Sequence, residues 1–109
     1  MPRQFLRALL YIAPPVPPET PPAHAETLYA LHQLSVGAFL TEHRFLTPDF
    51  AVEEARYSNG AHIVINQSET NDYASGELRL PPLGFAVTHP KMTVSADRRS
   101  PPLLREPHL

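Results

Sequence analysis

Glu53 and Glu54 are the adjacent carboxylates of this sequence, and acid–base catalysis is the first chemistry that they suggest. A glycosidase needs two carboxyl groups that converge on one bond from about 5–10 Å apart. Neighbouring residues of a strand point to opposite faces of the sheet, so this pair predicts a solvated strand with one charge at its rim. Four further acidic residues lie beside turn or loop residues, where solvation or capping is expected: Asp49, Glu69, Asp72 and Glu77.

The six histidines raise the question of a metal site. His24 and His32 would lie about 12 Å apart along a helix axis, which is too far to share one ion. His43, His62 and His89 could meet only through the tertiary fold, and no His-x-His or His-x-x-x-His spacing occurs. The sequence also lacks the Gly-x-Ser-x-Gly elbow of hydrolases and a glycine-rich phosphate loop. We therefore predict no catalytic set, no metal and no cofactor, and we do not expect the chain by itself to be an enzyme.

Three aromatic rings could stack on a sugar. Tyr57 and Phe85 lie in strand-like segments and are predicted to be core residues, whereas Tyr73 lies in a polar loop and is the candidate sugar contact. An exposed aromatic row on one sheet face would favour a free-standing carbohydrate- or protein-binding β module, and the sequence pattern does not predict one. Asn66-Gln67-Ser68 matches the acceptor triplet for N-glycosylation, which has meaning only in a chain that a eukaryote secretes.

Composition argues against several classes of partner. The net charge is -2 and the pI about 6.3, and no basic stripe is present, so nucleic acid is not expected to bind. No stretch reaches the ~20 apolar residues of a membrane span. The apolar run of residues 8–13 follows two arginines as in a signal peptide, but prolines come directly after it, and we do not expect one. The absence of cysteine fits a reducing compartment; the compartment stays open, with a cytoplasmic location favoured.

Prolines divide the first forty residues. Residues 13–22 hold six of the 14 prolines and predict a connector. Before the connector, the apolar segment 5–13 fits either a short buried strand or one helical turn, because its period does not choose between them. After the connector, Thr20 is a good N-cap, and the apolar spacing predicts an amphipathic helix over residues 21–40.

Beyond the helix the apolar residues recur with period two, which predicts antiparallel strands. The clearest hairpin spans residues 50–66. A register that pairs Ala55 with Ile63 and gives Gly60 a positive φ collects the apolar side chains on one face. Only Glu53 then sits awkwardly on that face.

These elements predict an α+β fragment in three parts. Residues 1–41 hold the apolar segment, the connector and one amphipathic helix; residues 42–94 form a small antiparallel sheet or half sandwich; residues 95–109 form a disordered, proline-rich tail. Without the connector and the tail, roughly 70 to 80 residues remain, which is a marginal size for an independent core.

Two stretches of the sequence, taken in order, carry a resemblance to a known family. The first is Arg7-Ala8-Leu9-Leu10-Tyr11-Ile12-Ala13-Pro14-Pro15. The second contains His43-Arg44-Phe45-Leu46-Thr47-Pro48-Asp49, Arg56-Tyr57-Ser58-Asn59-Gly60, Val64-Ile65-Asn66 and Leu80-Pro81-Pro82-Leu83-Gly84-Phe85. Together they resemble the C-terminal region of large bacterial glycoside hydrolases: the first is similar to a late segment of their (β/α)8 barrel, and the second to the small β-sandwich that follows it. The family's acid and nucleophile lie in the barrel, upstream of every matching residue, so no catalytic role is carried over.

The resemblance implies a non-catalytic C-terminal accessory β-domain that packs on a catalytic barrel and sometimes lends a loop to its sugar cleft. The alternatives are a free-standing carbohydrate- or protein-binding β module and an inactive product of a truncated gene. One small sheet cannot cover both the N-terminal segment and the helix, so we expect an apolar patch near the N-terminal segment. That patch would bind the barrel or a second copy of the chain, and carbohydrate is a further candidate partner.

Overall fold

The computed structural model describes residues 2–76, 78–97 and 100–105, and this part of the chain forms two helices and eight strands. The elements, in chain order, are α1 (Pro2–Leu10), α2 (Pro22–Leu34), β1 (Leu40–Phe45), β2 (Val52–Tyr57), β3 (His62–Asn66), β4 (Tyr73–Ser75), β5 (Leu78–Leu80), β6 (Phe85–His89), β7 (Met92–Asp97) and β8 (Ser100–Arg105). Neither helix is long and apolar enough to cross a membrane, within the residues described.

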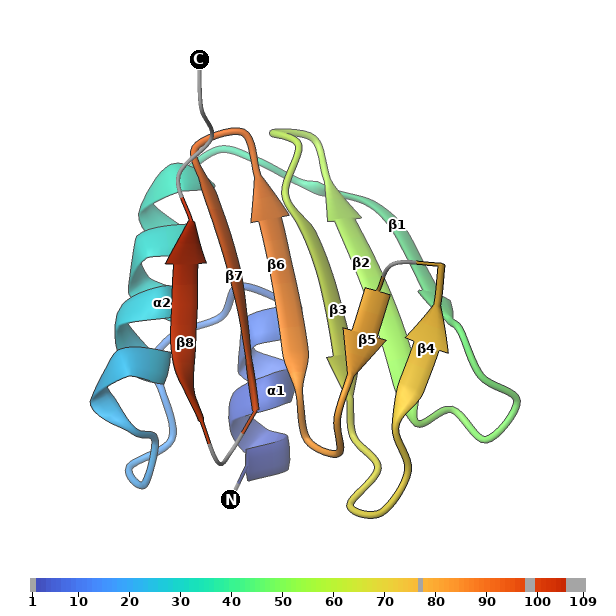
Figure 1. Cartoon of the computed structure of the whole chain (residues 1–109). Coiled ribbons are helices and arrows are strands. Elements are labelled where there is room, and N and C mark those ends of the chain that lie inside the picture. Colours follow the sequence, from blue (N-terminus) through green and yellow to red (C-terminus); the bar gives the residue numbers. More distant parts are fainter. Residues whose placement is uncertain (1, 77, 98–99, 106–109) are drawn as a thin grey trace.

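Six strands form one antiparallel sheet in the order β1-β2-β3-β6-β7-β8. Both helices lie on one face of this sheet, with α1 behind its middle and α2 beside β8, and the short β4–β5 hairpin lies against the opposite face (Figure 1). The predicted α+β architecture, with helix followed by a small antiparallel sheet, is confirmed.

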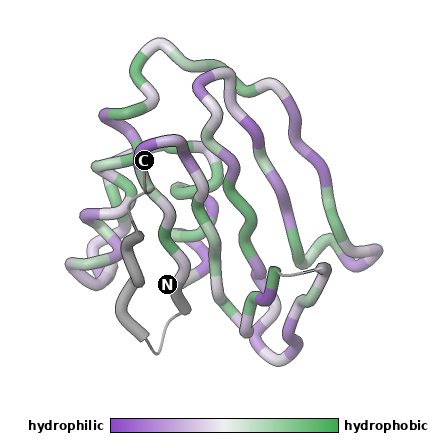
Figure 2. Tube along the Cα trace, turned by 45° about the horizontal axis from the view of Figure 1, so that its top comes forward, coloured by the Kyte–Doolittle hydropathy of each residue, from purple (hydrophilic) through white to green (hydrophobic). Residues whose placement is uncertain are grey.

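The main core fills the space between the helices and the sheet, and a smaller one lies under the β4–β5 hairpin. Hydrophobic residues gather on the central strands, while hydrophilic ones follow the strands at the β1 end (Figure 2). The smaller core consists of Val52, Val64 and Leu80. The main core contains Phe5, Leu6, Leu9, Leu10, Ile12, Leu28, Leu31, Ala55, Ala61, Ile63, Ile65, Leu83, Phe85, Val87, Met92 and Val94.

The N-terminal apolar segment is a helix, which resolves the choice between strand and helical turn. Phe5, Leu6, Leu9 and Leu10 are buried, while Arg7 on the same helix is exposed. Buried positions at i, i+1, i+4 and i+5 are one face of an α-helix. The period becomes visible only when the polar residues before Phe5 are counted with the apolar run.

The second helix is shorter than predicted: it ends at Leu34 and not near residue 40. The chain leaves the helix at Ser35, and Gly37 then adopts a φ of +82°. Thr20 was expected to cap the N-terminus, but Pro21 holds that position and no side chain caps the helix. Two consecutive prolines explain the difference, because they remove the N–H groups that a threonine cap would bind first.

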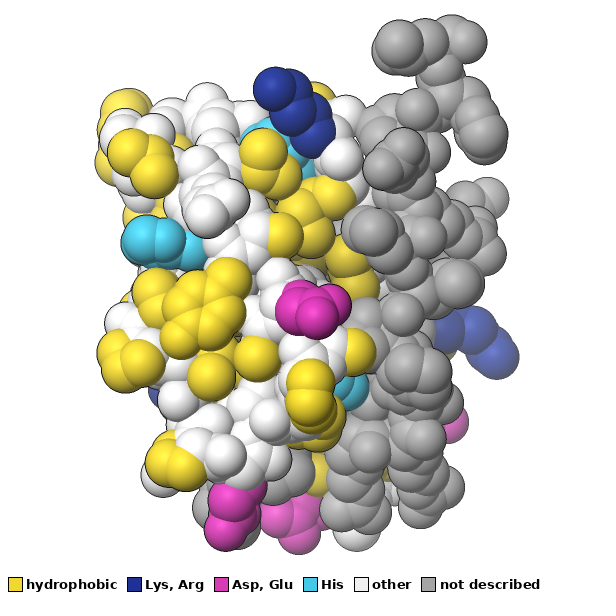
Figure 3. Space-filling model, turned by 90° about the vertical axis from the view of Figure 1, so that its left-hand side faces the viewer, with side chains coloured by type: hydrophobic (Ala, Val, Ile, Leu, Met, Phe, Trp, Pro, Cys, Tyr) yellow, Lys and Arg dark blue, Asp and Glu magenta, His cyan; other side chains and the backbone are white. Residues whose placement is uncertain are grey.

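The apolar patch expected beside the N-terminal segment is not found over α1, but Tyr11, which follows α1 in that segment, is 41% exposed. Leu6, Leu9 and Leu10 are at most 1% exposed, because the sheet is wide enough to cover both helices. On the α2 side, hydrophobic side chains reach the surface in separate spots between polar, acidic and histidine side chains (Figure 3). Within the described residues, the exposed large hydrophobic side chains are Tyr11, in the N-terminal segment, and six others that lie mostly toward the β1 end of the sheet: Tyr29, Val36, Phe39, Leu40, Phe45 and Phe50.

The structure also extends the sheet into the segment predicted as a disordered tail. Strand β7 continues to Asp97, and β8 pairs with it antiparallel between Ser100 and Arg105. A backbone ladder can form here without regard to side-chain period, which is why the alternation of apolar residues did not indicate β8. Residues 98–99 and 106–109 of the predicted tail lie outside the described residues.

The predicted hairpin register is confirmed. Ala55 pairs with Ile63 and Glu53 with Ile65 across β2 and β3. Gly60 has a φ of +90°, and its N–H donates to the carbonyl of Tyr57 at 3.0 Å. Glycine reaches this region at no steric cost, so Gly60 fixes the register that buries the apolar face.

We expect Gly60→Val to lower the free energy of unfolding by about 1–2 kcal/mol through backbone strain. An added Cβ would also lie 3.1 Å from Cδ of Pro90. Gly37→Val is the matched control, because Gly37 has a similar φ of +82° but no heavy atom within 4 Å of an added Cβ. Urea unfolding should therefore show the larger loss at Gly60. An equal loss at both positions would mean that the Pro90 contact is unimportant.

Candidate functional site

A cleft of about 380 Å³ opens between the β1–β2 loop and the segment that leads into β4, and Tyr73 forms part of its wall. A second hollow of about 240 Å³ adjoins this cleft, because Asp72 and Tyr73 line both. The first cleft is lined by Thr47, Pro48, Asp49, Ala51, Val52, Asn66, Ser68, Asn71, Asp72 and Tyr73. This Tyr73 cleft is the concave region in which the sequence-predicted sugar contact lies.

The buried side chain of Asn66 positions the loop after β3, which lines the cleft through Ser68 and Asn71. The side-chain amide nitrogen of Asn66 donates to the carbonyls of Asn71 at 2.8 Å, Leu80 at 3.2 Å and Pro81 at 3.2 Å. Its side-chain oxygen accepts from the N–H of Ser68 at 3.0 Å. Asn66 is 1% exposed, and these bonds satisfy a polar group that would be costly to bury unpaired. The loop is therefore positioned by β3.

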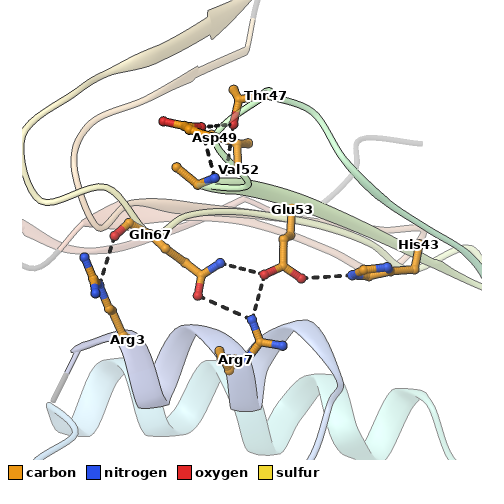
Figure 4. A network of polar contacts seen from close by, with 9 residues as sticks. Arg3, Arg7, His43, Thr47, Asp49, Val52, Glu53 and Gln67 are labelled. Atoms are coloured by element: carbon orange, nitrogen blue, oxygen red, sulfur yellow. Dashed lines mark hydrogen bonds and ion pairs between the residues drawn. The ribbon is translucent and has the colours of Figure 1, made fainter.

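The opposite wall is the turn at Thr47-Pro48-Asp49 between β1 and β2. The Asp49 carboxylate accepts from the Thr47 hydroxyl at 2.6 Å and from the Ala51 N–H at 3.1 Å (Figure 4). The hydrogen bonds from Thr47 and then Ala51 lower the pKa of Asp49, so it is an anion at neutral pH. Asp49 is a capping residue, as the sequence predicts, and it is also exposed beside the cleft.

The cleft combines the groups that suit a polyhydroxylated ligand. Tyr73 is the first residue of β4 and does not lie in a loop as predicted; it packs against the smaller core, and the part of its side chain that lines the cleft offers an apolar surface to the C–H face of a sugar. Asp49 and Asp72 supply acceptors, while the amide of Asn71 can both donate and accept. A few polar groups around an apolar surface are typical of small-molecule sites.

The two adjacent glutamates lie elsewhere, and the expectation that they are solvated was wrong. Glu53 is 1% and Glu54 4% exposed. Glu53 faces the helices: Arg7 donates to its carboxylate at 2.6 Å, Gln67 at 2.6 Å and His43 lies at 2.9 Å (Figure 4). The network joins α1, β1 and the residue that follows β3 around one buried anion on β2.

Glu54 sits on the opposite face of β2, as neighbours on a strand must. Arg44 lies 2.8 Å and His62 2.9 Å from its carboxylate, and Arg56 lies 3.7 Å away. Each glutamate therefore has its own cationic partners, and the sheet separates the two carboxyl groups.

Both glutamates are ionised at neutral pH. Burial alone would raise the pKa of Glu53, but hydrogen bonds from His43, Arg7 and Gln67 outweigh it and lower the pKa. For Glu54, burial acts in the same direction and is outweighed by His62 and Arg44. A glycosidase acid needs a raised pKa so that it carries a proton. These two groups have the electrostatics of structural anions.

The histidines are spread over the fold. His24 lies in the core between the rings of Phe5 and Phe85, and His89 is also buried, where burial and then the charge of Lys91 lower its pKa. His43 and His62 bind different glutamates on opposite faces. Among the described residues, no group of three or more His, Asp or Glu side chains could hold a metal ion.

Sequence reasoning missed a row of exposed rings at the β1 end of the sheet. The ring of Tyr11 stacks on His43 at 6.0 Å, His43 contacts Phe45 at 5.5 Å, and Phe45 contacts Phe50 at 4.7 Å between centroids. Tyr11 is 41%, Phe45 46% and Phe50 64% exposed. We call these four residues the aromatic row. They come from α1's end, β1 and a loop, so no local pattern could have shown them.

The two rings predicted to be core residues are placed accordingly. Phe85 is fully buried, and Tyr57 packs against the main core. The Tyr57 hydroxyl donates to the carbonyl of Leu10 at 2.8 Å, and burial raises its pKa to about 12. Phe85 is closed to a ligand and Tyr57 is only partly exposed, and among the three rings Tyr73 is the one that lines the cleft.

No protein-family model matches this chain, and no curated protein matches it significantly.

Proposed function

We propose that this chain is a non-catalytic accessory β-domain of a glycoside-hydrolase-like protein, and that it contacts carbohydrate at the Tyr73 cleft. The observation that carries the proposal is the cleft itself, where one aromatic ring stands beside two carboxylates and an amide. Short sequence strings that resemble the small sandwich of those enzymes include residues of its wall, among them Thr47 and Asp49.

The state of the glutamates supports a binding role over a catalytic one. Glu53 and Glu54 are the described carboxylates with the deepest burial, yet each is held as an anion by its own partners. Hydrolysis of a glycoside needs a protonated acid and a second carboxylate on the same bond. The sheet that separates the two groups prevents that arrangement.

Titration with maltohexaose, cellohexaose and xylohexaose, followed by amide NMR shifts, tests the binding site. We expect shifts confined to residues 47–51 and 66–73 with at least one of the three sugars. Tyr73→Ala should weaken that binding at least tenfold, about 1.4 kcal/mol. Asp72→Ala, at an exposed position, should weaken it without disturbing the fold.

Tyr29→Ala is the control, because Tyr29 is a 45% exposed ring on α2, far along the chain from the cleft. The same preparations should release no nitrophenol from aryl glycosides. Unchanged affinity in both cleft variants would remove the site, and turnover that Glu53→Gln or Glu54→Gln abolishes would overturn the non-catalytic role.

A protein-binding β module is the second candidate. The aromatic row favours it, because large exposed rings that touch one another are unusual on a surface that binds nothing. The aromatic row and the Tyr73 cleft meet at the β1–β2 loop, where Phe50 lies between the cleft residues Asp49 and Ala51.

A further inference from the structure

Strand β1 ends the sheet, and its outer side has no partner strand within the described residues. Along β1, residues whose backbone N–H and C=O groups face β2 alternate with residues whose groups face outward, and the register with β2 shows which residues are which. The N–H of Leu46 donates to the carbonyl of Val52 at 2.8 Å, and Arg44 pairs with Glu54 two residues earlier. In an antiparallel ladder the bonded pairs alternate, so His43 and Phe45 direct their backbone groups to the free edge.

A free edge with exposed apolar side chains is a template for another strand. Leu40 is 43% and Phe45 46% exposed on β1, and Phe39, just before it, is 67% exposed. Among the described residues, most of the exposed large hydrophobic side chains thus lie on or near the strand whose outer backbone groups have no partner strand. Both features point to a strand as the occupant.

We propose that β1 pairs antiparallel with β1 of a second copy of this chain, with the two-fold axis at His43. The inference goes beyond sugar binding and does not depend on it. The pairing would join two sheets into one continuous sheet and bring the two aromatic rows side by side.

Charge favours this register over its two neighbours. With the axis at His43, Glu42 of each copy lies opposite Arg44 of the other. An axis at Glu42 would place two glutamates opposite each other, and an axis at Arg44 would oppose two arginines. Directly opposed like charges destabilise a sheet, while opposite charges stabilise it. Glu42 is 48% and Arg44 58% exposed, so both side chains are accessible to a partner.

The directions of the backbone groups fit the same register. The N–H and C=O of His43 point to the free edge, so the two His43 residues would form a hydrogen-bonded pair. The residues on either side of them would form the closer pairs without hydrogen bonds. A register shift marks a bulge between Leu40 and Glu42, and the strand ends at Phe45. These limits keep the pairing short and favour a closed dimer over open-ended addition.

Sedimentation velocity at rising concentration tests the proposal with charge variants. The natural chain should form dimers. Glu42→Arg and Arg44→Glu should each sediment as monomers, with dimerisation weakened at least tenfold. Mixed in equal amounts, the two variants should form a heterodimer, because each glutamate then faces an arginine of the other chain. Far-UV circular dichroism establishes that both variants are folded.

A cysteine variant keeps the test valid if Arg44→Glu fails to fold beside the buried Glu54. The chain has no natural cysteine, so His43→Cys should cross-link to itself on mild oxidation. Val36→Cys, at a 79% exposed position away from β1, should not. A natural chain that stays monomeric up to millimolar concentration would overturn the proposal. A dimer that the charge variants do not weaken would overturn the register.

Discussion

Phe85→Ala should lower the free energy of unfolding by about 3–5 kcal/mol, the range for removing a buried phenylalanine from a packed core. Phe85 is fully buried on β6, and its ring contacts Phe5 of α1 at 5.6 Å and His24 of α2 at 5.4 Å in edge-on geometry. The substitution therefore removes the contact that both helices share with the sheet. A domain of ordinary stability, about 5–15 kcal/mol, would lose a large share of it.

Phe50→Ala is the matched control, since the same atoms are removed from a ring that is 64% exposed. We expect a change within about 0.5 kcal/mol in urea unfolding followed by circular dichroism. Losses of similar size at both positions would show that the helices do not pack on β6 as described.

Arg7→Met should lower the free energy of unfolding by about 2–3 kcal/mol at pH 7. Removing one partner of a fully buried ion pair costs about 3–5 kcal/mol, because the other charge is left uncompensated. The loss is smaller here because Arg7 is itself half-exposed and because His43 and Gln67 still bind Glu53. The double variant Arg7→Met/Glu53→Gln should recover most of the loss, since no uncompensated buried charge then remains on the helix side of the sheet.

The effect should depend on pH in a defined direction. The folded pKa of Glu53 is lowered, so its stabilising contribution is present above the ordinary carboxyl pKa and is lost as the pH falls through the lowered value. The deficit of Arg7→Met should therefore shrink in acid. Arg44→Met, at the exposed partner of Glu54, should cost less, because Arg56 and His62 remain near that carboxylate. A deficit that is constant from pH 7 to pH 3 would contradict the role of Glu53.

The sequence predicts the hairpin of β2 and β3 well because its information is local. Alternation along each strand and one glycine at positive φ decide both the register and the faces. The same local logic failed for α1, where an apolar run gave no period until the polar residues before it were counted. It also failed for β8, since a strand at the sheet edge can form through backbone bonds alone.

The surroundings of Glu53 could not be predicted from its neighbours, because Arg7, His43 and Gln67 are all distant in sequence. One signal was present. The preferred register places Glu53 on an otherwise apolar face, and a buried carboxylate needs a cation. Arg7 is the arginine inside the N-terminal apolar run, so the pair could have been matched before the fold was known. The aromatic row had no such signal.

The environment of Asn66 has a consequence for producing the chain. The nitrogen that would receive a glycan in the Asn66-Gln67-Ser68 triplet is the same nitrogen that donates to three backbone carbonyls. A folded chain therefore offers no acceptor, and a glycan attached earlier would prevent the β4 loop from closing on β3. Expression through a eukaryotic secretory route would divide the product into a folded, unmodified fraction and a modified fraction that cannot reach the same structure. Expression in a bacterial cytoplasm, where this triplet is not glycosylated, should give the folded, unmodified chain alone.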